Sequence, residues 1–110
     1  MKGIYLSGPV TGNEEALHDF ARAEALAEKL YPNALIFNPM KIAAGTPDLS
    51  YEEILDLDLM ILDRFCDHIL MIRGWWGSRG ANRELGFAIA KGFHIDYETP
   101  SGVTPVRTTY

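Results

Sequence analysis

The clearest evidence for the class of fold is the stretch HILMIRGWWGSRGANRELGFAIAKG, residues 68–92. It begins with the continuous apolar run 68–72, which is typical of a strand buried on both faces of a sheet. A turn rich in glycine follows, and residues 79–91 then have the spacing of a helix, with Gly92 placed to end it. A buried strand, a turn and a helix in this order form the repeating unit of parallel α/β sheets.

The same signals recur on both sides of this stretch. Three more short apolar runs predict strands, at residues 4–6, 34–37 and 93–97. Apolar residues at helical spacing predict helices over 14–30 and 51–65, and Ser50 with Glu53 fits a capping box at the start of the second. Residues 38–50 contain two prolines and one glycine without periodicity, which predicts a long loop.

The alternation of strands and helices implies right-handed crossovers and a parallel sheet with helices on both faces. We therefore predict an α/β protein with a small parallel sheet of four to five strands. One domain is expected over residues 1–98, followed by a C-terminal tail over 99–110. Ligands of such sheets bind outside the carboxyl ends of the strands, so the binding site is expected in the loops that follow the strands.

The composition narrows the class of partner. A chain of 110 residues that is 47% hydrophobic can bury one core. Its net charge of −5 argues against a nucleic-acid groove, which needs clustered Lys and Arg, so a small molecule or a protein is the expected partner. Cys66 is the single cysteine, and we find neither a secretory leader nor an apolar run of about 20 residues, which predicts a cytoplasmic protein without a membrane partner.

Two glycine-containing turns are the candidate binding loops. In the first, Gly8, Pro9 and Thr11 precede a helix, at a place where backbone amides can hold an anion. A tight turn without a ligand is the alternative.

The second turn carries Trp75 and Trp76 beside Ser78, Arg79 and Gly80. Adjacent tryptophans in a loop have to pack or stack, and an aromatic ring stacks on a nucleobase for about 1–3 kcal/mol. The alternative is that one covers the edge of the core and the other packs in an oligomer interface. We expect at least one of them to be structural.

Two carboxylates are the candidate catalytic groups, because Glu84 and Asp58 both lie on apolar helix faces, where an acid needs a partner or a function. Two carboxylates at one sheet edge can break a glycosidic bond, one as nucleophile or charge stabiliser and the other in proton transfer. Tyr5 could hydrogen-bond either of them. The alternatives are a helix-capping Glu84, an Asp58 paired with Arg83 or Lys41, and a Tyr5 that only packs in the core.

No metal site is predicted from the spacing of the histidines. His18 is expected on a solvent face, and neither His68 nor His94 has a sequence neighbour at the spacing of metal ligands. Cys66 is an unsuitable nucleophile, because Asp67 beside it raises its pKa. We therefore expect neither a metal nor a cofactor.

The motif IYLSGP at residues 4–9, Asp58, and the Ser-x5-Glu-Leu-Gly motif that starts at Ser78 together resemble the nucleoside 2-deoxyribosyltransferase superfamily. The resemblance spans nearly the whole chain. It is nearest to a branch of short phage and bacterial proteins marked by a YLSGP start and a Gly-Trp-x-x-Ser-x-Gly-Ala loop, which stands here at residues 74–81.

This resemblance implies a flavodoxin-like or Rossmann-like three-layer sandwich that cleaves or transfers at the bond between deoxyribose and base. It implies that Glu84 is the nucleophile on the anomeric carbon, that Asp58 supports proton transfer to the base, and that Tyr5 orients the nucleophile; Asp56 is an alternative second carboxylate. It also implies a homodimer or higher homo-oligomer, and the helix over 51–65, which is apolar beyond one stripe, indicates a partner subunit as well.

The substrate implied depends on Ser78 and the first turn. Family transferases have an acid at the Ser78 position, whereas related 2-deoxynucleoside 5′-monophosphate N-glycosidases have a serine that contacts phosphate, so Ser78 favours a nucleotide. Those hydrolases have Ser and Arg where this chain has Pro9 and Thr11. Here the phosphate is expected to be bound instead by Thr11, Arg79 and backbone amides. A family loop that reaches the neighbouring subunit is missing here or is replaced by the tail over 99–110.

The expected function is therefore that of an N-glycosidase or deoxyribosyltransferase acting on a deoxynucleoside or its 5′-monophosphate. Three alternatives remain open: a non-catalytic nucleotide-binding or sensing module, an NAD-type ribosyl hydrolase, and an interaction protein built on the apolar helix over 51–65.

Overall fold

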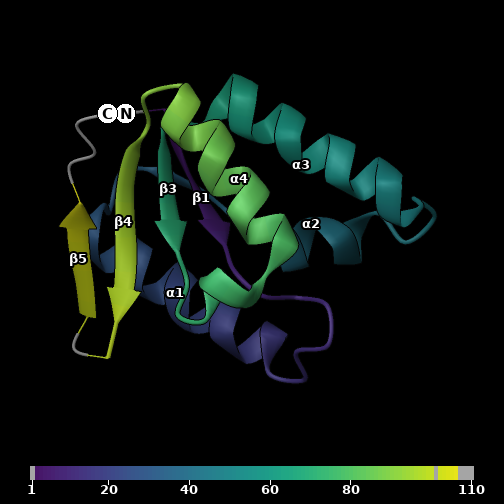
Figure 1. Cartoon of the computed structure of the whole chain (residues 1–110), viewed down its shortest axis with the longest axis horizontal. Coiled ribbons are helices and arrows are strands. Elements are labelled where there is room, and N and C mark those ends of the chain that lie inside the picture. The colour runs from purple at the N-terminus through teal and green to yellow at the C-terminus, as the bar shows by residue number, and fades with distance from the viewer. Residues whose placement is uncertain (1, 101, 107–110) are drawn as a thin grey trace.

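The structure, a computed structural model, describes residues 2–100 and 102–106 as one sheet with helices on both faces (Figure 1). The strands are β1 (Gly3–Ser7), β2 (Leu35–Phe37), β3 (His68–Met71), β4 (His94–Thr99) and β5 (Gly102–Val106). The helices are α1 (Ala16–Leu30), α2 (Pro39–Gly45), α3 (Tyr51–Phe65) and α4 (Arg79–Ala90), with a single 3-10 turn, η1 (Trp75–Gly77), before α4.

The sheet has the strand order β2-β1-β3-β4-β5, in which β1 to β4 are parallel and β5 is antiparallel to β4. This order, with β1 between β2 and β3, is that of flavodoxin-like sheets. The predicted α/β class, a three-layer sandwich around a small sheet of four to five strands, is therefore confirmed. Part of the segment predicted as a tail, residues 102–106, is β5.

β1 shows how the sheet separates two cores. Successive side chains of a strand point to opposite faces. Ile4 and Leu6 accordingly pack in a cluster with Phe20 of α1, whereas Tyr5 packs in a second cluster with Leu62 of α3 and with buried residues of α4. α1 thus covers one face of the sheet, and α3 and α4 cover the other (Figure 1).

The local helix signals explain where α3 and α4 begin. The predicted capping box is present, since the Ser50 hydroxyl accepts from the Glu53 amide and the Glu53 carboxylate accepts from the Ser50 amide. Ser78 caps α4 by accepting from the Ala81 amide. Within the described residues, no helix combines the length and apolarity needed to cross a membrane.

The prediction of an unbroken loop over 38–50 is wrong, because α2 occupies its first half. Asn38 caps this helix by accepting from the Met40 amide, and Pro39 stands at its first position, where a missing N–H costs nothing. A helix of seven residues is too short to display an apolar period, so its proline and glycine were the only visible signals and were misinterpreted.

Candidate active site

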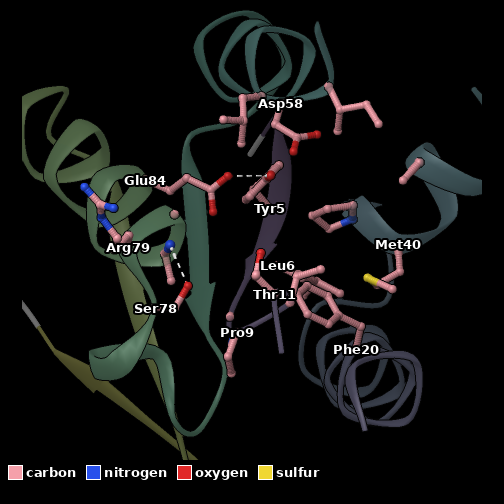
Figure 2. Close-up of a pocket in the computed structure, with 18 of the residues that line it drawn as sticks. Tyr5, Leu6, Pro9, Thr11, Phe20, Met40, Asp58, Ser78, Arg79 and Glu84 are labelled. Atoms are coloured by element: carbon pink, nitrogen blue, oxygen red, sulfur yellow. Dashed lines mark hydrogen bonds between the residues drawn. The ribbon is translucent and has the colours of Figure 1, made fainter. Parts of the chain in front are cut away.

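A cavity of about 550 Å³ lies beyond the carboxyl end of β1, between α2, α3 and the start of α4 (Figure 2). All three predicted catalytic residues line it: Tyr5, Asp58 and Glu84. Six of the predicted substrate-binding residues line it too: Gly8, Pro9, Thr11, Ser78, Arg79 and Gly80. The fold therefore brings together residues that are up to 79 positions apart in the chain.

Glu84 is the most firmly held of the candidate catalytic groups. It stands on the face of α4 that is directed to the sheet, and only 8% of its surface is exposed. Its two carboxylate oxygens accept separate hydrogen bonds, Oε2 from the Tyr5 hydroxyl at 2.7 Å and Oε1 from the Ser7 hydroxyl at 2.7 Å. Burial raises the pKa of Glu84, although these hydrogen bonds and the charge of Arg83 act in the opposite direction.

Ser7 is a site residue that the sequence analysis missed. It is buried in β1 and donates to Glu84 just as Tyr5 does. The available signal was strand alternation, because residues 5 and 7 of one strand point to the same face. A Tyr-x-Ser pair facing a helix that carries one glutamate could have been found on this basis.

Tyr5 is fully buried beside both acids. Burial raises the pKa of its hydroxyl well above 10, and the nearby charges of Glu84 and Asp58 raise it further. The hydroxyl therefore keeps its proton and serves as a donor to Glu84. Figure 2 shows the Asp58 carboxyl on the other side of this hydroxyl from Glu84.

Asp58 reaches the cavity from α3 and is 6% exposed. Its Oδ1 atom has no hydrogen-bond partner among the described residues. Burial, and then the charge of Glu84, raise the pKa of Asp58 to about 7. Lys41, considered as its partner on sequence grounds, pairs with Glu24 at 2.7 Å instead. Asp58 is therefore a carboxyl that exchanges its proton near neutral pH.

Asp56, the alternative second carboxylate, is an exposed residue of α3 and is not among the residues that line the cavity. Two positions along a helix correspond to about 200° of rotation. The burial of Asp58 and the exposure of Asp56 follow directly from this rotation.

The two glycine-containing turns form one wall of the cavity. Gly8 is packed so closely that a Cβ atom there would lie 2.8 Å from the Ile72 Cβ, which explains why this position has no side chain. Ser78 accepts from an amide of α4 and still has its hydroxyl proton to offer to a ligand. Arg79 is the only Arg or Lys residue that lines the cavity among the described residues.

The opposite wall is apolar, and the sequence analysis did not predict it. It consists of residues from α1, α2 and α3, among them Phe20, Met40, Ile54 and Leu55. The sequence did not identify these residues as part of the site. Met40 lies in α2, which was predicted as loop, and the apolar residues of α1 and α3 that line the cavity look the same in sequence as those that pack in the core.

The structure does not bring the two tryptophans to the cavity, since neither is among its lining residues. Trp75 packs against the core and against Tyr97, with ring centroids 5.5 Å apart. Trp76 is 70% exposed and meets Trp75 edge to face. A structural role for Trp75 agrees with the expectation that at least one of the pair packs.

The candidate metal ligands among the described residues lie outside this cavity. Cys66 is buried, and burial followed by the charge of Asp67 raises the pKa of its thiol to about 12, which makes it a poor ligand and nucleophile. The described residues do include one group with the donor atoms for an ion, His68, His94 and Asp96. The prediction that these histidines lack suitable neighbours is therefore corrected: Asp96 stands two residues after His94 on β4, and His68 joins them from the adjacent strand β3.

Comparison with known proteins gives one family. Searches of the curated proteins and of the solved structures gave no match. The model of a domain of unknown function, DUF4406, matches residues 2–97, a range that contains every residue of the cavity wall and most of the sheet. The chain therefore belongs to the DUF4406 family.

Proposed function

We propose that this protein is an N-glycosidase or deoxyribosyltransferase that cleaves the bond between base and deoxyribose in a deoxynucleoside or its 5′-monophosphate. The observation that carries the proposal is a buried Glu84, held by Tyr5 and Ser7, next to an Asp58 with a pKa of about 7 in one cavity. The likeness of residues 4–9 and of the Ser78 to Gly86 motif to the deoxyribosyltransferases supports the same chemistry.

In the proposed first step, a carboxylate oxygen of Glu84 attacks the anomeric carbon of the sugar. The bond from that carbon to the base nitrogen breaks, its electron pair stays on the base, and the protonated Asp58 delivers its proton to the departing base. The product is a covalent ester between Glu84 and deoxyribose. Tyr5 and Ser7 hold the Glu84 side chain in the orientation for attack.

In the second step, Asp58 is a carboxylate and takes a proton from water. The water oxygen attacks the anomeric carbon and releases Glu84, which restores both groups. If a second base replaces the water, the same step transfers the sugar. A pKa of about 7 suits Asp58 to this alternation between acid and base.

The two walls of the cavity match the two ends of such a substrate. The apolar wall formed by Phe20, Met40 and their neighbours is suited to the flat face of a base. Ser78 and Arg79, at the start of α4, are suited to the 5′ end of the sugar, where a phosphate would also meet the positive end of the helix dipole.

The test is release of free base by the purified protein from a panel of deoxynucleosides, deoxynucleoside 5′-monophosphates, the matching ribose compounds and NAD. We expect release from at least one deoxyribose substrate and a loss of more than about 10³-fold in Glu84→Gln. Glu14→Gln, which alters an exposed residue, is the matched control. Release only from ribose compounds, or an undiminished rate in Glu84→Gln, would contradict the proposal.

A second candidate is a non-catalytic nucleotide-binding module. It is favoured by one observation: both oxygens of Glu84 already accept hydrogen bonds, as in a purely structural carboxylate. Binding of a nucleotide without release of base, with equal affinity in Glu84→Gln, would identify this function.

We also propose that the protein is a homo-oligomer. Several large apolar side chains of α3 are exposed, namely Tyr51, Met60 and Phe65. Met60 and Phe65 lie outside the cavity wall, and large apolar side chains exposed on one helix can be covered by a partner subunit. Light scattering after size-exclusion chromatography would test this, and a monomer at all concentrations would exclude it.

A further inference from the structure

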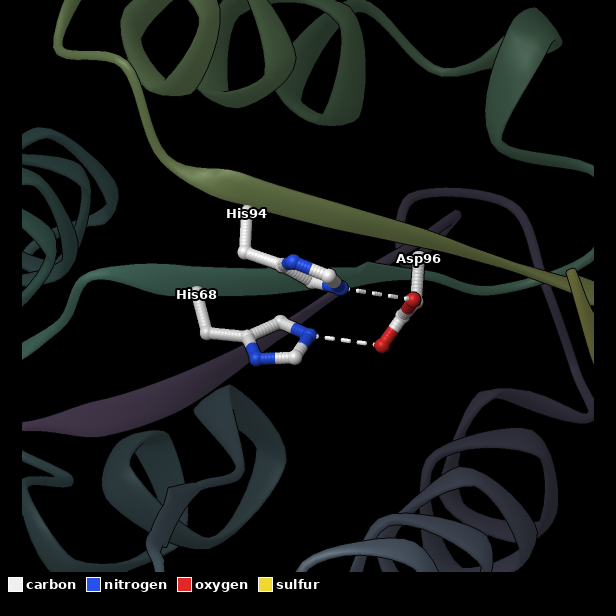
Figure 3. A group of neighbouring side chains, drawn as sticks. All are labelled: His68, His94 and Asp96. Atoms are coloured by element: carbon white, nitrogen blue, oxygen red, sulfur yellow. Dashed lines mark hydrogen bonds and ion pairs between the residues drawn. The ribbon is translucent and has the colours of Figure 1, made fainter. Parts of the chain in front are cut away.

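Figure 3 shows a second cluster of polar side chains, His68, His94 and Asp96. It contacts Tyr31, which follows α1, and so lies on the face of the sheet opposite to Glu84 and Asp58. His68 and His94 begin the parallel strands β3 and β4 and are paired in register. Asp96 follows His94 by two residues and so points to the same face. Three side chains with metal-binding atoms therefore meet at one point of the sheet.

The donor atoms of this cluster converge. The His68 Nε2 atom lies 2.6 Å from Asp96 Oδ2, and the His94 Nε2 atom lies 3.1 Å from Asp96 Oδ1. All the donor atoms lie within 4.8 Å of one another. In a tetrahedral zinc site, bonds of about 2.0 Å place neighbouring ligand atoms about 3.3 Å apart. To reach this spacing, the 2.6 Å contact of His68 has to open and the atoms that are farthest apart, at up to 4.8 Å, have to approach, which rotation of the half-exposed His94 side chain can supply.

Two of the three side chains are held in place by their surroundings. His68 and Asp96 are each 1% exposed, and the Tyr31 hydroxyl donates to Asp96 Oδ2 at 2.9 Å, which fixes the carboxylate. The Tyr31 ring also packs edge to face on His68, with centroids 4.7 Å apart. The side chain of His94 is 46% exposed, so it can adjust to an ion and provides the route by which an ion enters.

A metal at Nε2 of His68 would replace the proton with which this atom binds Asp96 Oδ2, at 2.6 Å, in the metal-free protein. A histidine that coordinates through Nε2 must carry its proton on Nδ1. The Nδ1 atom of His68 has no hydrogen-bond partner among the described residues, so no donor occupies that position and blocks the proton.

We propose that His68, His94 and Asp96 bind a divalent transition-metal ion, zinc in the first place, through the two Nε2 atoms and the Asp96 carboxylate. Two imidazoles and one carboxylate suit zinc and its neighbours, whereas magnesium and calcium prefer oxygen ligands only. The fourth ligand is water from the side of His94. The ion would join β3 to β4 on the face opposite the cavity, so it takes no part in the glycosidic chemistry.

The experiment is titration of the tag-free protein with zinc alone, followed by calorimetry, and with cobalt, followed by its visible absorption. We expect one ion per chain and a rise in the melting temperature on zinc binding. His94→Ala should weaken zinc binding by more than about tenfold, since even the loss of a residue that only supports a ligand costs about 10–100-fold. His18→Ala, which removes an exposed histidine of α1, should leave binding unchanged.

A second measurement keeps the test independent of the folding of the variants. Nitrogen-15 NMR of the histidine rings in the unaltered protein should show zinc-dependent shifts at Nε2 of His68 and His94 and none at His18. Failure of the unaltered protein to bind zinc, equal binding in His94→Ala, or shifts confined to His18 would each overturn the proposal.

Discussion

The two faces of the sheet carry two buried carboxyls with opposite properties. Asp58, on the face of α3 and α4, is 6% exposed, and Asp96, on the face of α1, is 1% exposed. Burial and the charge of Glu84 raise the pKa of Asp58 to about 7. Burial alone would raise the pKa of Asp96 too, but hydrogen bonds from His68 and then Tyr31 outweigh it and lower the pKa.

Burial favours the neutral form of both acids, and the neighbouring groups decide which of the two keeps its proton. Asp58 has another acid beside it and an oxygen without a hydrogen-bond partner among the described residues, so it readily holds a proton. Asp96 accepts from three side chains and remains an anion. A carboxyl of the first kind suits proton transfer, and one of the second kind suits a cation.

The largest effect is expected at the first face, from Asp58→Asn. The amide cannot deliver a proton to the leaving base, so kcat/KM for base release should fall by about 10²–10⁴-fold. In the unaltered protein kcat/KM should fall as pH rises through about 7, because Asp58 loses its proton there. A profile of kcat/KM against pH for both proteins measures the loss in the variant and the fall near pH 7. If Asp58→Asn still shows the fall near pH 7, a group other than Asp58 causes it.

The second face is tested by Asp96→Asn in metal-free protein. The variant loses charge-assisted hydrogen bonds, so its free energy of unfolding at neutral pH should drop by about 2–3 kcal/mol. The lowered pKa of Asp96 means that its ionised form stabilises the fold above the unfolded pKa and that this stabilisation is lost as pH falls through the folded pKa. The difference between the proteins should therefore shrink below about pH 4.

Urea unfolding at several pH values measures this difference. Asp63→Asn is the control, because Asp63 forms an exposed ion pair with Lys91 at 3.0 Å, and such pairs contribute only about 0–1 kcal/mol. A loss in Asp96→Asn no larger than in the control would show that the Asp96 network adds little to stability.

A smaller effect is expected from Ser7→Ala, which removes one of the two donors to Glu84. The carboxylate loses a hydrogen bond that favours its charged form, so the pKa of Glu84 should rise and the acid limb of the pH profile should move to higher pH. We expect about a tenfold loss of base release, equivalent to one charge-assisted hydrogen bond of about 1.4 kcal/mol. An unmoved acid limb would show that Tyr5 alone sets the charge of Glu84.

The smallest effect is expected from Trp76→Ala. The side chain is 70% exposed and lies outside the cavity wall, so stability should change by less than about 0.5 kcal/mol. Thermal unfolding and KM for the best substrate provide the measurement. A large rise in KM would instead support the sequence-based prediction that this tryptophan stacks on a base.

Local patterns in the sequence predicted the class of fold and the polar side of the cavity. The buried run 68–72, the capping box at Ser50 and the spacing around Glu84 each reflect interactions within a few residues, so they are visible in one dimension. Asp58 was found for the same reason, since its neighbours at helical spacing are apolar. The short helix α2 carried too few residues to show a period.

The order of strands and helices, and the side of each helix that is buried, thus follow from local patterns. The neighbours and register of the strands do not, because parallel pairing joins segments that are far apart in the chain. That pairing places His68 beside His94 on the neighbouring strand, within hydrogen-bond distance of Asp96. The packing of α4 on β1 brings the Ser7 hydroxyl within hydrogen-bond distance of Glu84. Strand alternation puts Ser7 on the face of Tyr5 and Asp96 on the face of His94, but the polar partners across the sheet, Glu84 and His68, leave no period in the sequence and were placed only by folding.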